Sequence, residues 1–182
     1  MATHERIRRY RRVALWIGII LATIWGLSWG LGKEQWGPFR GQIVDVGTGK
    51  PIKGAAVLVV WLKDILTPVH SVTQFYDARE VVTDAEGRFV VPRRIPALFW
   101  IFIRKPQVTY FAPGYVAHGE VVTPPDGRPF VDPTIVQMRR LKSREELLKK
   151  RRSQPAMVPL NKMTEFTKAI NVERKMLGFK PL

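Results

Sequence analysis

The sequence predicts an all-β fold, an antiparallel sandwich or barrel of seven to eight short strands, preceded by one transmembrane helix and followed by a short helical tail. Three observations predict it. An uncharged, mostly apolar run fills residues 13–31, short β-rich runs broken by Gly, Pro and Asp fill residues 38–141, and the apolar period becomes helical after Leu141. The chain of 182 residues has room for one such domain besides the run and the tail.

The apolar run Val13–Leu31 is long enough for a membrane-spanning helix. Its length as an α-helix is roughly 28 Å, close to the hydrocarbon thickness of a bilayer. Five arginines precede it within the basic segment 1–12, and short flanking basic clusters stay on the cytoplasmic side. We therefore expect a single-pass protein of the inner (cytoplasmic) membrane, with a cytoplasmic N-terminus and a periplasmic or extracellular domain. The alternative is a cleaved secretory signal, for which the run is long.

The net charge of +15 at pH 7 is concentrated at the two ends of the chain. Residues 1–12 carry +4 and residues 139–182 carry +9, whereas residues 13–138 carry only +2. Strong basicity raises nucleic acid as a partner. Topology explains the first cluster, however, and the second would lie outside the cytoplasm, so we expect no nucleic acid. Anionic headgroups, an acidic envelope polymer or an acidic protein face fit better. The absence of Cys excludes disulfides and thiolate metal sites.

A spacer over residues 32–37 leads into the β-rich domain of residues 38–141. Ala55–Leu62 is apolar on both faces, which predicts a central strand. Thr83–Gly87 suits a tight hairpin, because Asp begins such turns and Gly accepts the left-handed conformation at their end. Strands are predicted over residues 38–46, 55–62, 75–83, 88–91, 98–103, 107–112, 115–122 and 134–138.

The basic tail, residues 142–182, has two helical patterns. Ser143 and Glu146 occupy the N-cap and N3 positions of a capping box, and the helix that they begin runs into a basic cluster. A second helix is predicted from near Asn161 to near Gly178. The tail, residues 142–182, has too little apolar surface to fold alone. We expect its apolar stripe to lie in a groove of a partner while the basic cluster steers it to an acidic surface; the alternative is that the helices pack back on the sandwich or stay mobile. The stripe is Met163, Phe166, Ile170 and Leu177, and the cluster is Lys149, Lys150, Arg151 and Arg152.

Four motifs occur in order within the β-rich domain: Gly41–Asp45, Thr48–Val57, Thr83–Phe89 and Pro113–Tyr115. They resemble the carboxypeptidase regulatory-like domain, in which G-x-V-x-D-x-x-T-G-x-P-I-x-G-A-x-V, T-D-x-x-G-x-F and a late G-Y recur. The resemblance covers most of residues 40–141 and implies a seven-stranded antiparallel, transthyretin-like (prealbumin-like) sandwich. It also implies that these residues serve the fold: the glycines turns or close packing, Pro51 a rigid turn, and Ala55 and Val57 the core.

The chain departs from that family pattern in two segments. Lys63–Tyr76 is unusually long, and Pro92–Pro106 is unusually apolar. Such additions are where family members differ in partner.

Catalytic patterns are missing from the sequence. His4, His70 and His118 are far apart and have no metal-ligand spacing. The chain does not end in the Tyr-Arg-Gly-Ser motif of hydrolases with the transthyretin fold. Asp77 and Arg79, beside Glu80, are interpreted as a structural ion pair because alternate strand residues share a face.

We therefore expect a non-catalytic interaction module without cofactor or metal, an accessory or scaffolding subunit of a membrane complex. The first alternative is a binder of acidic cell-wall or envelope polymer, and the second is a small-molecule hydrolase of the transthyretin-like type. Exposed aromatic side chains along a groove would favour a glycan ligand. A flat apolar patch together with ordered tail helices would favour a protein partner.

Overall fold

The computed structural model describes residues 14–19, 22, 23, 26, 36–67, 70–94, 103–117, 134–149 and 157–182. The chain forms two compact units, Met1–Lys33 and Glu34–Leu182. The second unit contains the sheets as well as the helical tail, and it is described first.

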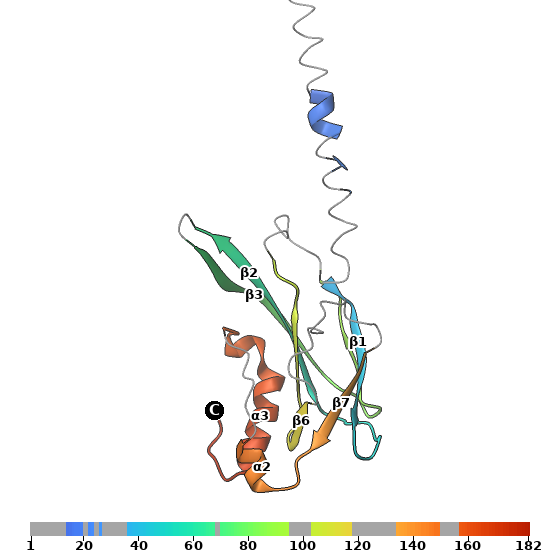
Figure 1. The fold of residues 1–182 in the computed structure, drawn as a ribbon, viewed down its shortest axis with the longest axis vertical. Helices are drawn as coiled ribbons and strands as arrows, with labels where there is room; N and C mark the ends of the chain where they lie inside the picture. Colours follow the sequence, from blue (N-terminus) through green and yellow to red (C-terminus); the bar gives the residue numbers. More distant parts are fainter. Residues whose placement is uncertain are drawn as a thin grey trace, which may run out of the picture. The chain divides into compact units, whose positions relative to one another are not determined.

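Among the described residues, seven strands form two sheets (Figure 1). The three-stranded sheet has the order β3-β2-β5, and the four-stranded sheet has the order β4-β1-β7-β6. The central pair β1 and β7 is parallel, with Gly41 opposite Thr134, whereas the other neighbours are antiparallel. The strands are β1 (Phe39–Asp45), β2 (Ala56–Leu66), β3 (Ser71–Val82), β4 (Arg88–Val91), β5 (Gln107–Phe111), β6 (Tyr115–Ala117) and β7 (Thr134–Arg140).

The predicted fold class, an all-antiparallel seven-stranded sandwich behind a transmembrane helix, is wrong. The four-stranded sheet is mixed, because its two central strands run in the same direction. Turn residues predict hairpins between neighbouring strands, but they carry no information about the relative direction of strands that meet from distant parts of the chain. The predicted strand over residues 98–103 and most of the one over 115–122 lie outside the described residues.

The predicted membrane span Val13–Leu31 is described only over residues 14–19, 22, 23 and 26, which are helical. Within the described part of the chain, no helix has the length and apolar character needed to cross a bilayer. The five arginines of residues 1–12 lie outside the described residues.

Apolar side chains from both sheets meet in one core. Alternate residues of β1 are buried, as expected for a strand with one face on a core. The indole rings of Trp36 and Trp61 stack with their centroids 6.3 Å apart, and Phe89 packs against Tyr110 at 5.8 Å. The core includes Trp36, Phe39, Ile43, Val57, Val59, Trp61, Phe89, Val91, Val108, Tyr110, Val136 and Met138.

The turn between β3 and β4 shows why its motif residues are needed. One carboxylate oxygen of Asp84 accepts the backbone N–H groups of Glu86 at 3.1 Å and of Arg88 at 2.7 Å. Gly87 has a φ of +69°, and a Cβ there would lie 2.5 Å from the carbonyl oxygen of Ile43. Any side chain at this position would therefore clash with β1, so the motif serves the fold, as the resemblance implies.

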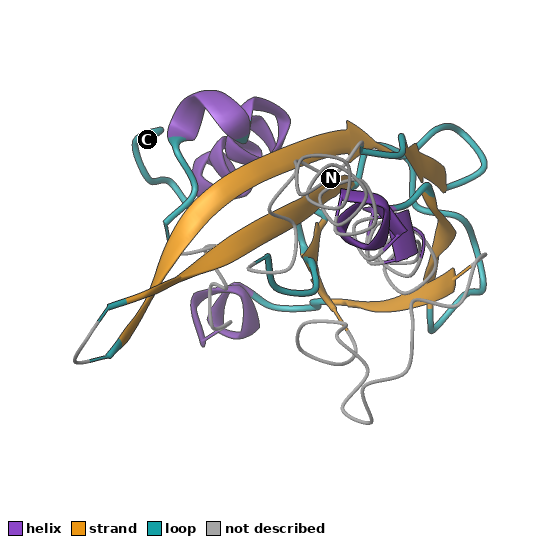
Figure 2. Cartoon of the chain, turned by 90° about the horizontal axis from the view of Figure 1, so that it is seen from above, coloured by secondary structure: helices purple, strands orange, loops and turns teal. Residues whose placement is uncertain are grey.

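Residues 63–67 and 70–76 of the long segment Lys63–Tyr76 belong to the outer part of the β2–β3 hairpin, which projects beyond the neighbouring strands (Figure 2). Asp64 braces it, because its carboxylate accepts hydrogen bonds from Arg104 at 2.7 Å and from the Thr73 hydroxyl at 2.8 Å. The Arg104 bond, followed by the Thr73 bond, lowers the pKa of Asp64 from its usual value. The backbone N–H of Arg104 also donates to the carbonyl of Leu62 at 2.8 Å, which ties the segment that begins at Ile103 to β2.

Both predicted tail helices are present. Helix α2 (Arg144–Lys149) begins as expected, with the Ser143 hydroxyl accepting the N–H of Glu146 at 3.1 Å. The second begins with the short 3₁₀ helix η3 (Leu160–Lys162) and continues as α3 (Thr164–Met176). It stops at Gly178, whose φ of +80° lets the N–H of Phe179 reach the Arg174 carbonyl at 2.8 Å.

Val57→Asp tests the central position of β2. Val57 is fully buried in the core, so the variant places a carboxylate there without a partner. We expect a loss of roughly 3 kcal/mol or more in the free energy of unfolding, measured by urea denaturation. Val82→Asp, at the exposed end of β3, should cost about 1 kcal/mol or less. Equal losses of unfolding free energy in the two variants would show that the assignment of Val57 to the buried core is wrong.

Tyr110→Phe tests a buried hydroxyl. The Tyr110 oxygen is buried and has no hydrogen-bond partner among the described residues, and burial raises the pKa of Tyr110 well above its usual range. The variant should keep its stability at neutral pH or gain up to about 1 kcal/mol. The unfolded chain ionises this phenol near pH 10, so wild-type stability should fall as the pH rises above that value, and the variant should lose this dependence. Strong destabilisation at pH 7 would indicate a partner for the hydroxyl.

Candidate interaction surface

Helix α3 covers the outer face of the three-stranded sheet, the face that points away from the core (Figure 1). The outward residues of β2 are apolar, and they form one buried cluster with the apolar stripe of the helix. The ring of Phe166 packs against Phe111 of β5 with the centroids 5.4 Å apart. The cluster contains Ala56, Leu58, Val60, Leu62 and Ala78 of the sheet and Met163, Phe166, Ala169 and Ile170 of the helical segment.

The structure brings the predicted partner-binding stripe together, but against this chain's own sheet. Met163, Phe166 and Ile170 are buried in that cluster, and Leu177 is also buried. Because α3 occupies the sheet, these side chains are not a surface that a partner can reach. This packing of α3 on the chain's own sheet corresponds to the alternative expectation for the tail, in which its helices pack back on the domain rather than into a groove of a partner. Lys149 is exposed at the end of α2, whereas Lys150, Arg151 and Arg152 lie outside the described residues.

A carboxylate from the sheet caps the N-terminus of α3. Glu80 of β3 accepts the backbone N–H groups of Glu165 at 2.9 Å and of Phe166 at 3.0 Å, and the hydroxyl of Thr164 at 2.9 Å. These N–H groups have no acceptor within the helix, and a negative charge there is also favoured by the helix dipole. No side chain of the helix's own N-cap residue, Met163, supplies this cap. The cap comes instead from a residue 85 positions earlier in the chain.

Two further contacts fasten the rest of α3. The carboxylate of Glu173 is only 3% exposed and accepts the N–H of Gly114, in the turn between β5 and β6, at 3.0 Å. At the other end of the helix, the guanidinium of Arg144 donates to the carbonyl of Leu177 at 3.2 Å. The helix is therefore held at both ends and in the middle by polar groups besides its apolar stripe.

A second polar cluster surrounds Asp77 at the edge of the three-stranded sheet. Asp77 and Arg79 share a face, as predicted, because they lie opposite the core residues Trp61 and Val59. Yet the ion pairs that the structure gives to Asp77 are with Arg94 at 3.1 Å and Lys162 at 3.5 Å. Asp77 thereby links β3 to the segment after β4 and to η3.

Arg94 in this cluster is stacked on aromatic rings. The guanidinium carbon of Arg94 lies 4.4 Å from the ring centroid of Tyr76 and 5.9 Å from that of Trp61. Its Nε atom bonds Asp77, and its Nη1 atom is buried without a hydrogen-bond partner in the described part of the chain. The cluster therefore joins β3 to the segment after β4 and holds this corner of the fold.

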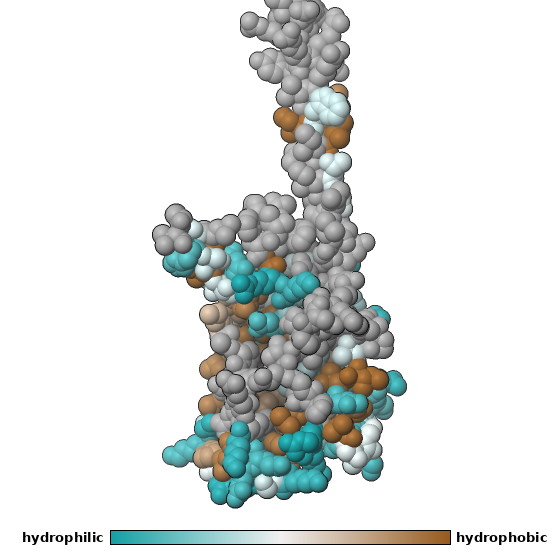
Figure 3. All heavy atoms as spheres, viewed as in Figure 1, coloured by the Kyte–Doolittle hydropathy of each residue, from teal (hydrophilic) through white to brown (hydrophobic). Residues whose placement is uncertain are grey.

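No helix or strand among the described residues covers the outer face of the four-stranded sheet, in contrast to the face that α3 covers. Its two most exposed aliphatic side chains are Val90, 55% exposed, and Ile135, 66% exposed. In Figure 3, apolar surface lies beside polar surface over the region where Figure 1 draws β1 and β7. The outward positions are Arg40, Gln42 and Val44 of β1, Arg88 and Val90 of β4, Val116 of β6, and Ile135, Gln137 and Arg139 of β7. We call this set the open sheet face.

Sequence reasoning did not single out the open sheet face. The structure shows the face through the burial of Arg88–Val91, whose residues alternate between exposed and buried, and of Thr134–Met138, in which Val136 and Met138 are the buried residues. Ile135 falls in the exposed phase of that alternation, where a polar residue is the ordinary choice.

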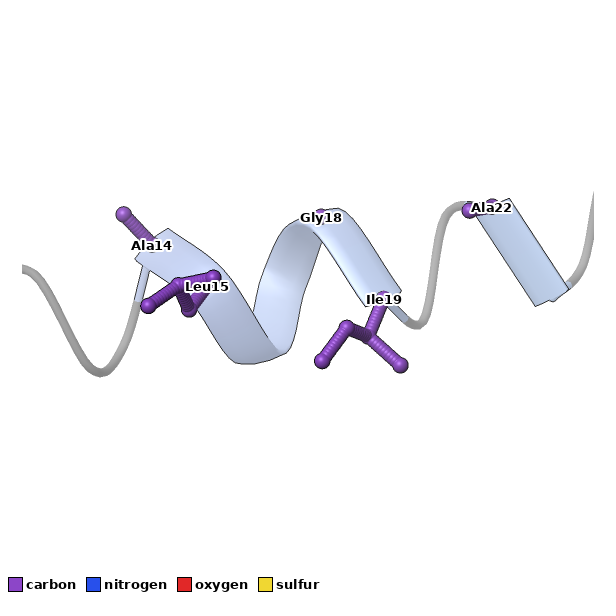
Figure 4. Close-up of a pocket in the computed structure, with 5 residues that line it drawn as sticks. All are labelled: Ala14, Leu15, Gly18, Ile19 and Ala22. Carbon is purple, nitrogen blue, oxygen red and sulfur yellow. The ribbon is translucent and has the colours of Figure 1, made fainter.

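Other candidate sites are weaker. Within the described ranges, no group of His, Asp or Glu side chains is placed to hold a metal ion. A hollow in the first unit follows one helical stretch and is lined by Ala14, Leu15, Gly18, Ile19 and Ala22 (Figure 4). None of these five residues has a polar side chain that could orient a ligand.

No family model, curated protein or solved structure matches this chain. The resemblance to the carboxypeptidase regulatory-like domain therefore stays a prediction that rests on the four motifs.

Glu80→Gln tests the cap on α3. The amide oxygen can still accept a hydrogen bond, but the charge that the helix N-terminus favours is lost, so we expect a cost of about 1 kcal/mol in the free energy of unfolding. Amide hydrogen exchange at Glu165 and Phe166 should accelerate. Glu86→Gln, in the exposed turn before β4, removes the same charge away from the helix and should leave exchange unchanged. Identical exchange in both variants would contradict the cap.

Proposed function

We propose that this protein is a non-catalytic protein-interaction module, an accessory or scaffolding subunit of a larger complex. The observation that carries the proposal is the unequal coverage of the two sheets. One outer face is closed by the chain's own helix α3, while the open sheet face leaves Val90 and Ile135 in solvent. Exposed aliphatic residues that share one face mark a contact surface more often than scattered ones do.

Five acidic side chains of the described residues support a scaffolding role, because they accept hydrogen bonds from backbone N–H groups of the fold. Asp45 accepts the backbone N–H of Gly47 at 2.7 Å, and Glu146 accepts that of Lys142 at 2.7 Å. Asp84, Glu80 and Glu173 likewise accept backbone N–H groups.

The character of the open sheet face favours a protein over a glycan. Its outward positions hold aliphatic, amide and guanidinium groups and no aromatic ring on which a sugar could stack. The face is a sheet surface rather than a groove, and the tail helix α3 is ordered, which is the combination expected for a protein partner. We place the complex outside the cytoplasm, because arginines ahead of the apolar run 13–31 are also the pattern of an export signal.

A photo-crosslinking amino acid at position 135 tests this function in cells of the source organism. We expect discrete protein adducts from position 135. The control is position 172, where Val172 is exposed on α3 away from the open sheet face. Ile135→Asp should abolish co-purification of the crosslinked protein, and Val172→Asp should preserve it. The absence of adducts at position 135, or the same adducts from both positions, would contradict the proposal.

A further inference from the structure

We propose that the outer surface of the helical tail rests on an anionic lipid bilayer. This surface belongs to α3 and the segment after it, away from the open sheet face, so the inference goes beyond the proposed function and stands independently of it. All of its residues are exposed, and we call the set the tail face: Lys168, Val172, Lys175, Met176, Phe179, Lys180 and Leu182.

The first part of the tail face is the solvent side of α3. With about 3.6 residues per turn, an arc of roughly 100° on the helix holds Lys168, Val172, Lys175 and Met176. Phe166 and Ile170 point the opposite way and are buried against the three-stranded sheet. Val172 is 48% exposed and Met176 is 62% exposed, one turn apart on the solvent side. The helix therefore has a second apolar side that contributes nothing to its packing on the sheet.

The segment after α3 folds back along the helix and completes this surface (Figure 1). The Nε atom of Arg174 donates to the carbonyl of Lys180 at 2.6 Å, and the backbone N–H of Leu182 donates to the side-chain carbonyl of Asn171 at 2.8 Å. The guanidinium carbon of Arg174 also lies 6.0 Å from the ring centroid of Phe179. These contacts hold two further exposed apolar residues, Phe179 and Leu182, beside the helix.

Lysines accompany the apolar residues of the tail face. Lys168 is paired with Glu165, the acidic residue at the border of the face, at 2.6 Å. In the part of the chain that the structure describes, the ammonium groups of Lys175 and Lys180 form no ion pair. An ammonium is a compact, strongly hydrated charge on a flexible stem, which suits a diffuse negative surface better than one matched carboxylate. The tail face therefore complements a surface of many anionic groups.

An anionic bilayer matches both halves of this composition. Apolar side chains enter the boundary between headgroups and acyl chains, while neighbouring lysines keep their ammonium groups at the phosphates. An acidic polysaccharide would engage the lysines and leave the apolar residues in water. A second copy of the tail face would bring lysines against lysines, which is costly. An acidic protein surface is the remaining occupant, and poly-L-glutamate stands for it in the experiment.

The composition of the tail face also sets the character of the contact. A few apolar side chains with two free charges give shallow, reversible binding that weakens as salt is added. Stable attachment to a bilayer takes a second signal. The tail face therefore orients the domain on a membrane. Because α3 and the open sheet face lie on the outer sides of opposite sheets, the open sheet face then points away from the lipid.

A fluorescent label on Met176→Cys tests the inference. The wild-type chain has no cysteine, so the label reports one position. The full-length protein is added to vesicles of phosphatidylcholine with phosphatidylglycerol, whose acyl chains carry a nitroxide quencher. We expect quenching at position 176, and far less on vesicles of phosphatidylcholine alone. The same label on Lys53→Cys, exposed between β1 and β2, should stay unquenched, so attachment through residues 13–31 does not produce the signal.

Charge variants of the labelled protein give a matched comparison. Lys175→Glu with Lys180→Glu should lower the ratio of docked to free tail face by about tenfold or more. Lys50→Glu with Lys53→Glu makes the same change in net charge at exposed positions elsewhere, and it should change the ratio by less than about twofold. Phe179→Ser should lower the ratio by about threefold or more, because the ring no longer enters the bilayer. Circular dichroism checks that all variants remain folded.

Three results would overturn the inference. The first is the same quenching at positions 176 and 53, or quenching at neither. The second is an equal loss of docking in the two charge variants, which would show that only net charge matters. The third is a change in the emission of the label with poly-L-glutamate as large as that with phosphatidylglycerol vesicles, which would favour an acidic protein surface. Crosslinking at position 135 reports on the open sheet face and tests the proposed function separately.

Discussion

Strand β2 is apolar on both of its faces, and each face has to be covered by a different part of the chain. Val57, Val59 and Trp61 point into the core that the two sheets share. Their neighbours Ala56, Leu58 and Val60 point outward and are covered by α3. Exposing an aliphatic side chain of this size costs roughly 2 kcal/mol. The tail helix is therefore a structural layer of the domain, and its apolar stripe packs against β2.

Carboxylates complete this arrangement by accepting backbone N–H groups where regular structure begins or turns. Glu80 does so for α3, Asp84 for the turn before β4, and Glu173 for the turn at Gly114. Such acceptors stabilise donors that would otherwise be buried without a partner. The four-stranded sheet has no comparable cover in the described residues, and Val90 and Ile135 on its outer face are exposed. In the described residues, the outer face of the three-stranded sheet is thus buried under α3, and the outer face of the four-stranded sheet is exposed.

Local features of the sequence predicted most of the elements. The double-sided apolar run indicated that β2 is central, Ser143 and Glu146 marked the start of α2, and the spacing of Met163, Phe166 and Ile170 gave the buried face of α3. Periodicity shows that a helix face is buried but not what covers it, so the stripe was assigned to a partner. The parallel pairing of β1 with β7 and the cap from Glu80 join residues far apart in the chain, and no local pattern encodes them. The open sheet face could not be assembled from any one strand, because the pairing of β1 with β4 and β7 is what brings Arg40, Val90 and Ile135 onto it.

The cap on α3 also has a consequence for the order in which the domain folds. The β2–β3 hairpin closes between neighbouring segments, whereas Glu80 must meet residues 85 positions away, and β1 must wait for β7. Contacts of such long range slow folding, because the chain loses loop entropy before the contacts form. Until α3 arrives, the outer side of β2 is an uncovered strip of aliphatic residues, the kind of surface on which partly folded chains associate. The layer that covers this strip thus comes from a distant part of the chain, and the strip is shielded from aggregation only after the tail has reached the sheet.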